Sequence, residues 1–235
     1  MVKKLIAIIP ARKNSKRIVN KNIIEFDGKP IIYWTIDAAL KSEIFDRIVV
    51  STDCEKIAQI SEDFGVKVPF LRSGLADDFT PVSEVSISTL NQAKDYWNED
   101  YEVVVQMMPN CPNRNKDDIK NAYNFFSDNN LDFLLSCSKF HSSIPWWSFT
   151  LSKDNKPNYN FPKLLKSRSQ DLDETYCNSG AIWIAKSSKL LKEKTFYGKN
   201  HFSYPINWSS ALDIDTYDDL EIAKAARAIS KYNND

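Results

Sequence analysis

The most constraining feature of this sequence is a repeated alternation of short apolar runs with longer segments of helical pattern. Buried strands are expected at 5–10, 47–52, 66–71, 101–108 and 133–138, and helices at 30–42, 55–64, 83–97 and 116–127. Strands separated by helices of about 10–15 residues are typical of βαβ units, which have right-handed crossovers. The sequence therefore predicts an α/β fold with a doubly wound, mostly parallel sheet. Such sheets bind ligands beyond the carboxyl ends of their strands.

The alternation stops between residues 141 and 175. This stretch contains Trp146, Trp147 and three prolines, and it is too long for an ordinary loop and too aromatic for a floppy one. The pattern then resumes with strands at 181–185 and 211–215 and a final helix at 216–229. We therefore expect one domain, residues 1–235, with an inserted excursion at 141–175 that docks on another subunit.

Composition excludes several classes of protein. The 31 basic and 31 acidic side chains cancel, which argues against a global nucleic-acid binder. No apolar run approaches the roughly 18 residues of a membrane span. The short apolar run at the N-terminus lacks the form of a signal sequence, so we expect a cytoplasmic protein. Only five glycines occur, and none form G-x-G-x-x-G or a Walker A loop, so any phosphate site must be built without them.

Cysteine and histidine chemistry is not expected here. The four cysteines are far apart and form no C-x-x-C pair, so we expect reduced structural cysteines and no zinc site. His141 and His201 are the only histidines, and neither has a carboxylate or nucleophile beside it in sequence. The sequence therefore does not favour a histidine-dependent triad.

A basic loop follows the first predicted strand. Residues 1–24 contain seven basic side chains and no acid, so the rest of the chain carries a balancing net charge of −7. Five of these cations lie between residues 12 and 21, at the carboxyl end of a buried strand. They predict an anion site of triphosphate scale, which Asn14, Ser15 and backbone N–H groups complete. The alternative is a solvated basic loop or a weak nucleic-acid patch, but the position after a strand favours the anion site.

An acidic pair, Asp213 and Asp215, lies near the other end of the chain. If 211–215 is a strand, these alternate residues face the same side, and their carboxylates suit a hard cation such as Mg²⁺. The acids alone are equally compatible with a structural role. Together with the basic loop, they favour a metal that bridges phosphate oxygens.

Other polar side chains lie at the same predicted edge of the sheet or in the excursion. Arg168 can bind a carboxylate through two parallel hydrogen bonds, and Gln170 can hydrogen-bond hydroxyls or amides, although an ordinary surface loop has the same composition. Further candidates lie after the second and third predicted strands or late in the fourth, where Ser, Thr and Asp are also routine helix caps. These are Asp53, Arg72, Thr80, Ser83 and Gln106.

Taken together, these segments resemble the acylneuraminate cytidylyltransferase family, the CMP-sialic acid synthetases, over nearly the whole chain. The family's opening motif has the form I-P-A-R-x-x-S-K-x-x-x-x-K-N, which Ile9–Asn22 matches in spacing. Ser51-Thr-Asp53, Arg168-Ser-Gln-Asp171, Asn178-Ser-Gly180 and Asp213-Ile-Asp215 resemble later family motifs in the same order. One such motif is weak, but the ordered set is specific.

The resemblance implies a nucleotidyltransferase fold and an enzyme that transfers CMP from CTP to the anomeric hydroxyl of a nine-carbon α-keto acid sugar, with Mg²⁺ as cofactor. It also implies a homodimer in which the 141–175 excursion helps complete the partner's site, with no nucleic acid or membrane involved. The implied catalytic residues are Arg12, Lys21 and Asp215, and the implied metal ligands are Asp213 and Asp215. The implied sugar contacts are Gln106, Arg168 and Gln170. The implied nucleotide contacts are Ala11, Arg12, Asn14, Ser15, Lys16, Lys21, Asn22, Arg72, Thr80 and Ser83.

The sequence departs from the family pattern after the fourth strand. The family commonly has Q-P-T-S-P-L-R, whereas this chain has Gln106-Met-Met-Pro-Asn-Cys-Pro-Asn-Arg114, which puts Met108 in the usual Gln place. Residues 68–73 and 77–80 look closer to a pseudaminic acid branch, and 178–183 to a sialic or legionaminic branch. The sugar, the number of metal ions and the general base therefore stay open.

Two other functions remain alternatives. A KDO or other sugar nucleotidyltransferase shares the fold, but KDO enzymes usually lack the Lys-Asn ending, and sugar-1-phosphate enzymes carry a glycine-rich opening loop that is absent here. A non-enzymatic nucleotide- or RNA-binding module could use the basic loop alone. The acidic pair is a poor feature for such a module.

Overall fold

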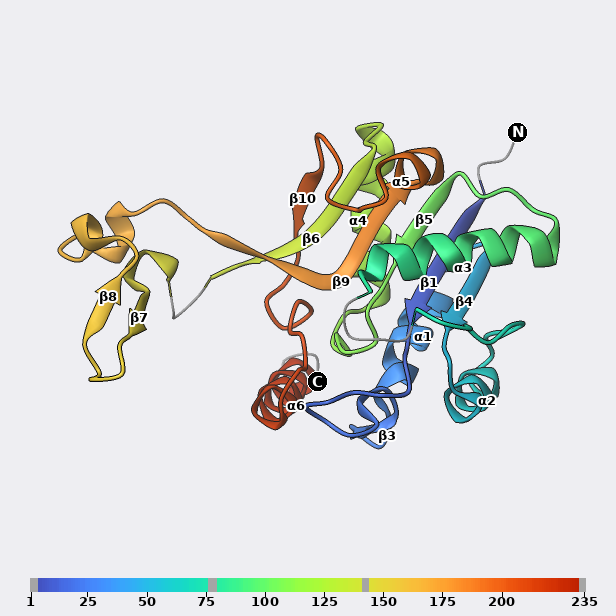
Figure 1. Ribbon diagram of the computed structural model, residues 1–235, viewed down its shortest axis with the longest axis horizontal. Helices are drawn as coiled ribbons and strands as arrows, with labels where there is room; N and C mark the ends of the chain where they lie inside the picture. Colours follow the sequence, from blue (N-terminus) through green and yellow to red (C-terminus); the bar gives the residue numbers. More distant parts are fainter. Residues whose placement is uncertain (1–3, 76–79, 141–143, 233–235) are drawn as a thin grey trace.

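A six-stranded sheet forms the centre of the molecule in the computed structural model, which describes residues 4–75, 80–140 and 144–232 (Figure 1). Every pairing in the sheet is parallel except those of β9, which runs antiparallel to β5 and β6. This arrangement confirms the expected mostly parallel sheet. The strand order is β10 (Phe202–Pro205), β6 (Phe133–Lys139), β9 (Tyr176–Lys186), β5 (Val103–Gln106), β1 (Leu5–Pro10) and β4 (Arg47–Ser51).

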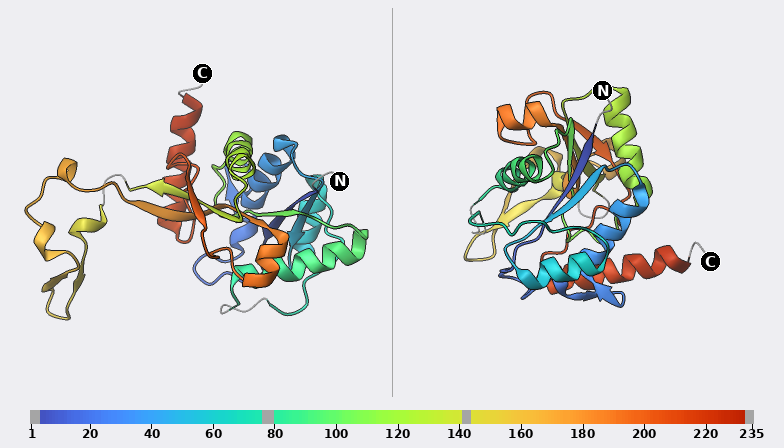
Figure 2. Two further views of the ribbon diagram at one scale, coloured as in Figure 1. Left: turned by 90° about the horizontal axis from the view of Figure 1, so that it is seen from above. Right: turned by 90° about the vertical axis from the view of Figure 1, so that its right-hand side faces the viewer.

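Helices cover both faces of this sheet, and Figure 2 shows α3 and α4 on opposite sides of it. Leu5 and Ala7 of β1 pack with residues of α1 and α4, whereas Ile6 and Ile8 pack with residues of α3 and α5. The continuous apolar run of β1 is therefore explained by a strand that is buried on both faces. The helices are α1 (Ile31–Ser42), α2 (Glu55–Asp63), α3 (Val82–Trp97), α4 (Lys116–Asp128), α5 (Ser187–Glu193) and α6 (Tyr217–Tyr232).

Two predicted strands are wrong. Residues 66–71 form only an isolated bridge between Val49 and Lys67, because Pro69 lacks the N–H that a continuing ladder needs. Residues 211–215 are a turn followed by irregular chain, whose Ile214 pairs with the loop after β5 and with no strand. The strand expected at 181–185 is the second half of the longer β9, and β10 was not predicted.

The chain between β1 and α1 holds the basic loop, a short 3-10 helix η1 (Lys21–Ile23) and a small hairpin of β2 (Glu25–Phe26) and β3 (Lys29–Pro30). Asp27 and Gly28 form the hairpin turn, with φ values of 53° and 76°. Positive φ at both positions is typical of a type I′ turn and explains the Asp-Gly pair. Arg227 of α6 lies over the Trp34 ring at 3.5 Å and pairs with Asp27, so α6 is fastened to this hairpin.

The described part of the predicted excursion, residues 144–175, forms an arm that extends from the end of β6 and the start of β9 (Figure 1). β6 and β9 remain paired as far as Lys139 and Tyr176. The arm contains the hairpin of β7 (Phe149–Leu151) and β8 (Pro157–Tyr159). Three 3-10 turns complete it: η2 (Pro145–Trp147), η3 (Pro162–Leu164) and η4 (Ser169–Asp171). Residues 141–143 of the predicted excursion lie outside the described residues. Among the described helices, none combines the length and apolar character of a membrane span.

Candidate active site

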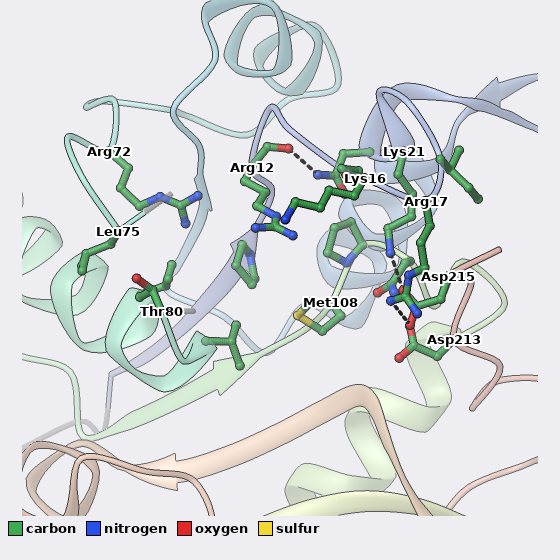
Figure 3. Close-up of a pocket in the computed structure, with 18 residues that line it drawn as sticks. Arg12, Lys16, Arg17, Lys21, Arg72, Leu75, Thr80, Met108, Asp213 and Asp215 are labelled. Carbon is green, nitrogen blue, oxygen red and sulfur yellow. Dashed lines mark hydrogen bonds and ion pairs between the residues drawn. The ribbon is translucent and has the colours of Figure 1, made fainter. Parts of the chain in front are cut away.

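A cavity of about 600 Å³ opens where β1 ends and the loop after β5 begins. β1, β4 and β5 run in the same direction, so their carboxyl ends meet at this edge, as the fold class predicts. The cavity is lined by three groups of residues from distant parts of the chain (Figure 3). These are Pro10, Arg12, Ser15, Lys16, Arg17, Ile18, Lys21 and Asn22; then Arg72, Leu75, Thr80, Val82 and Val85; and finally Met108, Pro109, Asn110, Asp213 and Asp215.

The basic loop is held in shape by backbone and side-chain hydrogen bonds. Ala11 N–H donates to the carbonyl of Ser51 at 2.9 Å, which continues the β1–β4 ladder. Asp53 accepts from the backbone N–H of Lys13 at 2.7 Å. The buried Asn22 side chain donates to the Arg12 carbonyl at 2.8 Å, which ties the two ends of the loop together. The loop therefore presents its cations from a fixed backbone.

Asp215 lies between two of the loop's cations. Lys21 Nζ is 2.7 Å from Asp215 Oδ1, and Arg17 Nη2 is 2.7 Å from Asp215 Oδ2. The same Lys21 ammonium also donates to the backbone carbonyl of Ile214 at 2.9 Å. Residues almost two hundred positions apart in sequence thus form one ionic cluster at the edge of the cavity (Figure 3).

Asp213 lies beside this cluster and carries the most perturbed carboxyl group of the cavity. Loss of solvation, followed by the charge of neighbouring Asp215, raises its pKa to about 6. The Cys111 thiol donates to Asp213 Oδ1 at 4.0 Å, and burial raises the pKa of that thiol, which keeps it protonated. Two neighbouring carboxylates that border the same cavity are oxygen donors of the kind that a hard divalent cation prefers.

The opposite end of the cavity is built by Arg72, Leu75 and Thr80, which Figure 3 shows across from the acidic pair. Arg72 is buried, and its backbone N–H donates to the carbonyl of Thr52 at 2.7 Å. Burial lowers the pKa of its guanidinium, and Nε has no hydrogen-bond partner. A buried guanidinium facing a cavity is suited to bind a polar or anionic group of a ligand.

Most of the predicted site residues line this one cavity. The members are Arg12, Ser15, Lys16, Lys21, Asn22, Arg72, Thr80, Asp213 and Asp215. Two loop residues do not line it: Ala11 is fully buried and extends the sheet, and Asn14 is exposed. The strand argument for the acidic pair was wrong, but the two carboxylates still meet at the same cavity.

Gln106 and Ser83 lie inside the protein and do not line the cavity. Gln106 is fully buried, and its Oε1 accepts from Ser86 Oγ at 2.7 Å. Ser83 is also buried, and its Oγ accepts from the backbone N–H of Phe196 at 3.4 Å. This placement does not support a direct ligand contact for either residue, because both fix α3 to neighbouring elements instead.

Arg168 and Gln170 lie on the arm and do not line the cavity of their own chain. Arg168 forms a bidentate ion pair with Asp171, with N–O distances of 2.7 Å and 2.9 Å. Arg168, Gln170 and Asp171 are all exposed. The motif that resembles R-x-Q-D is therefore a compact turn at η4. In a single chain it does not meet the sugar-binding role that the resemblance implies.

Several cavity residues were not predicted. Arg17 was counted among the loop's cations but given no role, and the structure pairs it with Asp215. Met108, Pro109 and Asn110 follow β5 at the edge where ligands bind, so position after a strand is a signal that could have identified them. Val82 and Val85 of α3 carry no chemical signature in sequence.

Comparison with known proteins agrees with this site. Residues 6–230 match the family model described as Cytidylyltransferase. A pseudaminic acid cytidylyltransferase of Campylobacter jejuni is 38% identical over 94% of this chain and 95% of its own. A CMP-N,N'-diacetyllegionaminic acid synthase of Legionella pneumophila is 34% identical over 91% of each chain. An N-acylneuraminate cytidylyltransferase of Streptococcus agalactiae is 33% identical over 92% of this chain and 52% of its own.

Solved structures share the fold at low sequence identity. A CMP:2-keto-3-deoxy-manno-octonic acid synthetase complexed with CTP superposes with a TM-score of 0.70 at 16% identity, covering 97% of this chain and all of that one. A cytidylyltransferase from Leptospira borgpetersenii superposes with a TM-score of 0.61 at 20% identity, covering 95% of this chain and 86% of the other. The family model and the relatives above 30% identity go further than the fold: this chain belongs to the cytidylyltransferase family and is a nucleotidyltransferase.

Proposed function

We propose that this protein transfers CMP from CTP to the anomeric hydroxyl of a nonulosonic, sialic-type acid. The hydroxyl oxygen attacks the α-phosphorus of CTP, a C–O–P bond forms, and the bond to the β-phosphate breaks. Pyrophosphate leaves, and the hydroxyl proton passes to a base. The single observation that carries the proposal is the cavity itself, where a fixed loop of cations faces a carboxylate pair.

The cationic side of the cavity suits the triphosphate. Arg12, Lys16 and Lys21 line it on the loop side, and their charges can neutralise the phosphates and stabilise the leaving pyrophosphate. Lys21 is paired with Asp215 here, so a bound triphosphate competes with that carboxylate for its ammonium group. Asn22, Arg72 and Thr80 also line the cavity and are our candidates for ribose and cytosine contacts.

The acidic side fits a magnesium ion. Loss of solvation and the charge of Asp215 raise the pKa of Asp213, and a divalent cation between the two carboxylates would relieve their mutual repulsion. Within the described residues, no group of three or more His, Cys, Asp or Glu side chains gathers to hold a metal. Phosphate oxygens would therefore share the ion with Asp213 and Asp215, and the ion would polarise the phosphate under attack. Either carboxylate is a candidate to help remove the hydroxyl proton.

Pseudaminic acid is our first candidate for the sugar. Two relatives of Campylobacter jejuni that carry this name match the chain over 94% of its length at 38% and 37% identity. Relatives named for legionaminic and N-acylneuraminic acids match at 34% and 33%, and a Helicobacter pylori relative whose name includes pseudaminic acid cytidylyltransferase matches at 28%. The differences are small, so the sugars must be compared directly.

The arm supports a homodimer. It carries a row of exposed apolar side chains, which would be covered if the arm packed on a second copy of the chain. We propose that Arg168 and Gln170 then reach the sugar in the partner's cavity, since they are remote from their own. The exposed residues are Trp147, Phe149, Leu151, Tyr159, Phe161 and Leu165.

A substrate panel tests this function. The purified protein is mixed with CTP, Mg²⁺ and one of four acids, namely pseudaminic, legionaminic, N-acetylneuraminic or KDO, and pyrophosphate release is followed. We expect release with at least one nine-carbon acid and the highest kcat/KM with pseudaminic acid. Release with KDO alone would replace the nonulosonate assignment, and no release with any acid would overturn the proposal.

A further inference from the structure

We propose that Asn110 is a positioning residue, which holds Ile214 so that the carboxylates on either side of it face the cavity. This inference rests on the proposed function, because it gives Asn110 a role toward the metal that Asp213 and Asp215 would bind. Asn110 lines the cavity in the loop after β5 and is only 4% exposed. It takes no part in the ionic cluster described above.

The acidic segment needs such a support because it lies outside the sheet. Two reciprocal bonds join its middle residue to Asn110: Ile214 N–H donates to the Asn110 carbonyl at 2.8 Å, and Asn110 Nδ2 donates to the Ile214 carbonyl at 3.2 Å. The Ile214 side chain is fully buried in a cluster with Phe26 and Ile31. One residue between the two acids is thus fixed through its backbone and its side chain.

Lys21 shares the carbonyl that Asn110 holds. Its ammonium donates to the Ile214 oxygen at 2.9 Å and to Asp215 at the same time. If a triphosphate draws this ammonium away, as the proposed function requires, the Asn110 amide keeps the same carbonyl bonded. The acidic segment then stays in place while its cation partner is engaged elsewhere.

The Asn110 amide makes one bond to the acidic segment and leaves its other polar atom unpaired. The Ile214 carbonyl can only accept, so Nδ2 must face it and Oδ1 is turned the other way. That oxygen is buried without a hydrogen-bond partner, which is a destabilising arrangement. A leucine of similar size would remove the unpaired oxygen together with the bond to Ile214.

Asn113 provides a matched control three residues further along the same loop. Its Nδ2 donates to the backbone carbonyl of Ala223 in α6 at 3.0 Å, and its Oδ1 is likewise buried without a partner. It does not line the cavity. Asn113→Leu thus removes the same kind of bond from the same loop without touching the acidic segment.

The experiment compares Asn110→Leu and Asn113→Leu with the unaltered protein. Thermal unfolding and CTP binding without metal show whether each variant is folded. Titration with Mn²⁺ in the presence of CTP, followed by electron paramagnetic resonance, measures metal affinity. Pyrophosphate release measures turnover. For Asn110→Leu we expect an unchanged or raised Tm and unchanged CTP binding. We expect metal affinity and kcat to fall about 10- to 100-fold, the usual effect of removing a partner of metal-binding groups. For Asn113→Leu we expect metal affinity and kcat to match the unaltered protein.

Two results would overturn the inference: an Asn110→Leu protein with unaltered metal affinity, or an equal loss of metal affinity in both variants. If Asn110→Leu does not fold, Asn110→Ser gives the same comparison, because its hydroxyl is too short to reach the Ile214 carbonyl. Failure of the proposed function shows differently, as an unaltered protein that releases no pyrophosphate. The Mn²⁺ titration still tests Asn110 in that case.

Discussion

Lys21 links the basic loop to the acidic segment of the site. Its ammonium contacts both Asp215 and the Ile214 carbonyl, and only 16% of the side chain is exposed. Replacing it by alanine removes one of the two cations that contact Asp215, together with the bond from its ammonium to the Ile214 carbonyl. We expect Lys21→Ala to lower kcat by about 10²- to 10³-fold, the range for losing one group that stabilises developing charge. Steady-state pyrophosphate release measures this effect.

Lys13 is the control for that substitution. It belongs to the same basic loop but does not line the cavity. Its hydrogen bond to the Asp53 carboxylate comes from its backbone N–H and not from its side chain. Lys13→Ala removes the same charge while leaving that hydrogen bond in place. An equal loss of kcat in both variants would mean that the loop acts through its net charge and that Lys21 has no individual role.

Gly180 leaves room for Met108 on the floor of the cavity. A Cβ at this position would lie 2.9 Å from Met108 Cγ and 3.8 Å from Asp213 Oδ2. Gly180→Ala therefore forces Met108 to shift within the site. We expect a several-fold lower kcat/KM for the sugar and a loss of about 1–3 kcal/mol in the free energy of unfolding, as for other overpacked positions. Substrate titrations and urea unfolding measure the two effects.

Gly198→Ala is the control that distinguishes the effect on the site from the effect on stability. A Cβ there would overlap the Phe133 ring, so Gly198→Ala strains the core more severely. Gly198 does not line the cavity. We expect a greater loss of stability than in Gly180→Ala, with normal kcat/KM per folded molecule. A sugar kcat/KM that falls equally in both variants would attribute the Gly180 effect to stability alone.

At the scale of elements, α6 begins with a capping box that also borders the site. Asp219 Oδ2 accepts from the backbone N–H groups of Thr216 and Asp215 and from the Thr216 hydroxyl, at 2.7, 3.0 and 2.8 Å. Thr216 Oγ1 in turn accepts from Asp219 N–H at 3.2 Å. This reciprocal pattern is the helix start that T-x-x-D predicts. The helix cap and the end of the acidic segment are therefore one structure.

The cap gives a pH-dependent prediction. Burial alone would raise the pKa of Asp219, but the hydrogen bonds from Thr216 and Asp215 outweigh it and hold that pKa below its ordinary value of 3.8. Because the folded-state pKa is lowered, the stabilisation is complete above pH 3.8 and is lost as the pH falls below it. We expect Asp219→Asn to cost about 0.5–2 kcal/mol at pH 7, the range for a lost cap. The difference from the unaltered protein should shrink in acid.

Urea unfolding of both proteins, at pH 7 and at the lowest pH where both remain folded, measures that difference. Asp218→Asn is the control, because this acid lies in the same helical turn but is exposed. If the difference in free energy of unfolding between Asp219→Asn and the unaltered protein stays constant with pH, the assigned direction of the Asp219 pKa is contradicted.

Helices were predicted more accurately than strands. The helices expected at 30–42, 55–64, 83–97 and 116–127 begin and end within one residue of the observed ones. Their apolar periodicity and end residues are local properties of the chain. The failures at 66–71 and 211–215 are segments with strand-like composition that find no partner strand, apart from the bridge at Lys67. Pairing is decided by the rest of the fold, so composition alone does not reveal it.

At the scale of the whole molecule, the arm leaves an apolar surface uncovered. Phe149 and Leu151 are alternate residues of β7 and are 47% and 60% exposed. Their substitution by serine should leave the domain folded and shift a dimer toward monomer, because alternate residues share one face. Sedimentation velocity over a range of concentrations measures the dimer. Tyr232→Ser, 84% exposed at the end of α6, is the control and should leave the dimer intact.

Mixing two inactive variants tests whether the arm completes the partner's site. In the proposed homodimer, Lys21→Ala would disable the cavity and Arg168→Ala would disable the arm, so each homodimeric variant would lack one component at both sites. A heterodimer has one site with both components intact. We expect mixed and re-equilibrated samples to regain activity that neither variant has alone. Activity that does not recover in confirmed heterodimers would refute the partner contribution of Arg168.

The sequence predicted the kind of site correctly but only some of the residues that form it. Charge placed after a strand identified the basic loop, and the spacing of Asp213 and Asp215 identified the acidic pair. Gln106 has the right position in the chain, but the strand geometry turns it inward to Ser86. Asn110 escaped notice because its role depends on contact with Ile214, about one hundred residues away.

By itself the sequence determined the α/β class, every described α-helix except α5, the cationic loop at a strand end and the family. These follow from local periodicity, local charge and motif spacing, which a linear chain displays directly. Only the tertiary structure decided that β9 runs antiparallel, so that Gly180 lies against Met108 and beside Asp213. It alone brought Lys21 to Asp215 and separated Arg168 from the cavity. Such contacts depend on how distant segments pack, and sequence spacing does not contain that information.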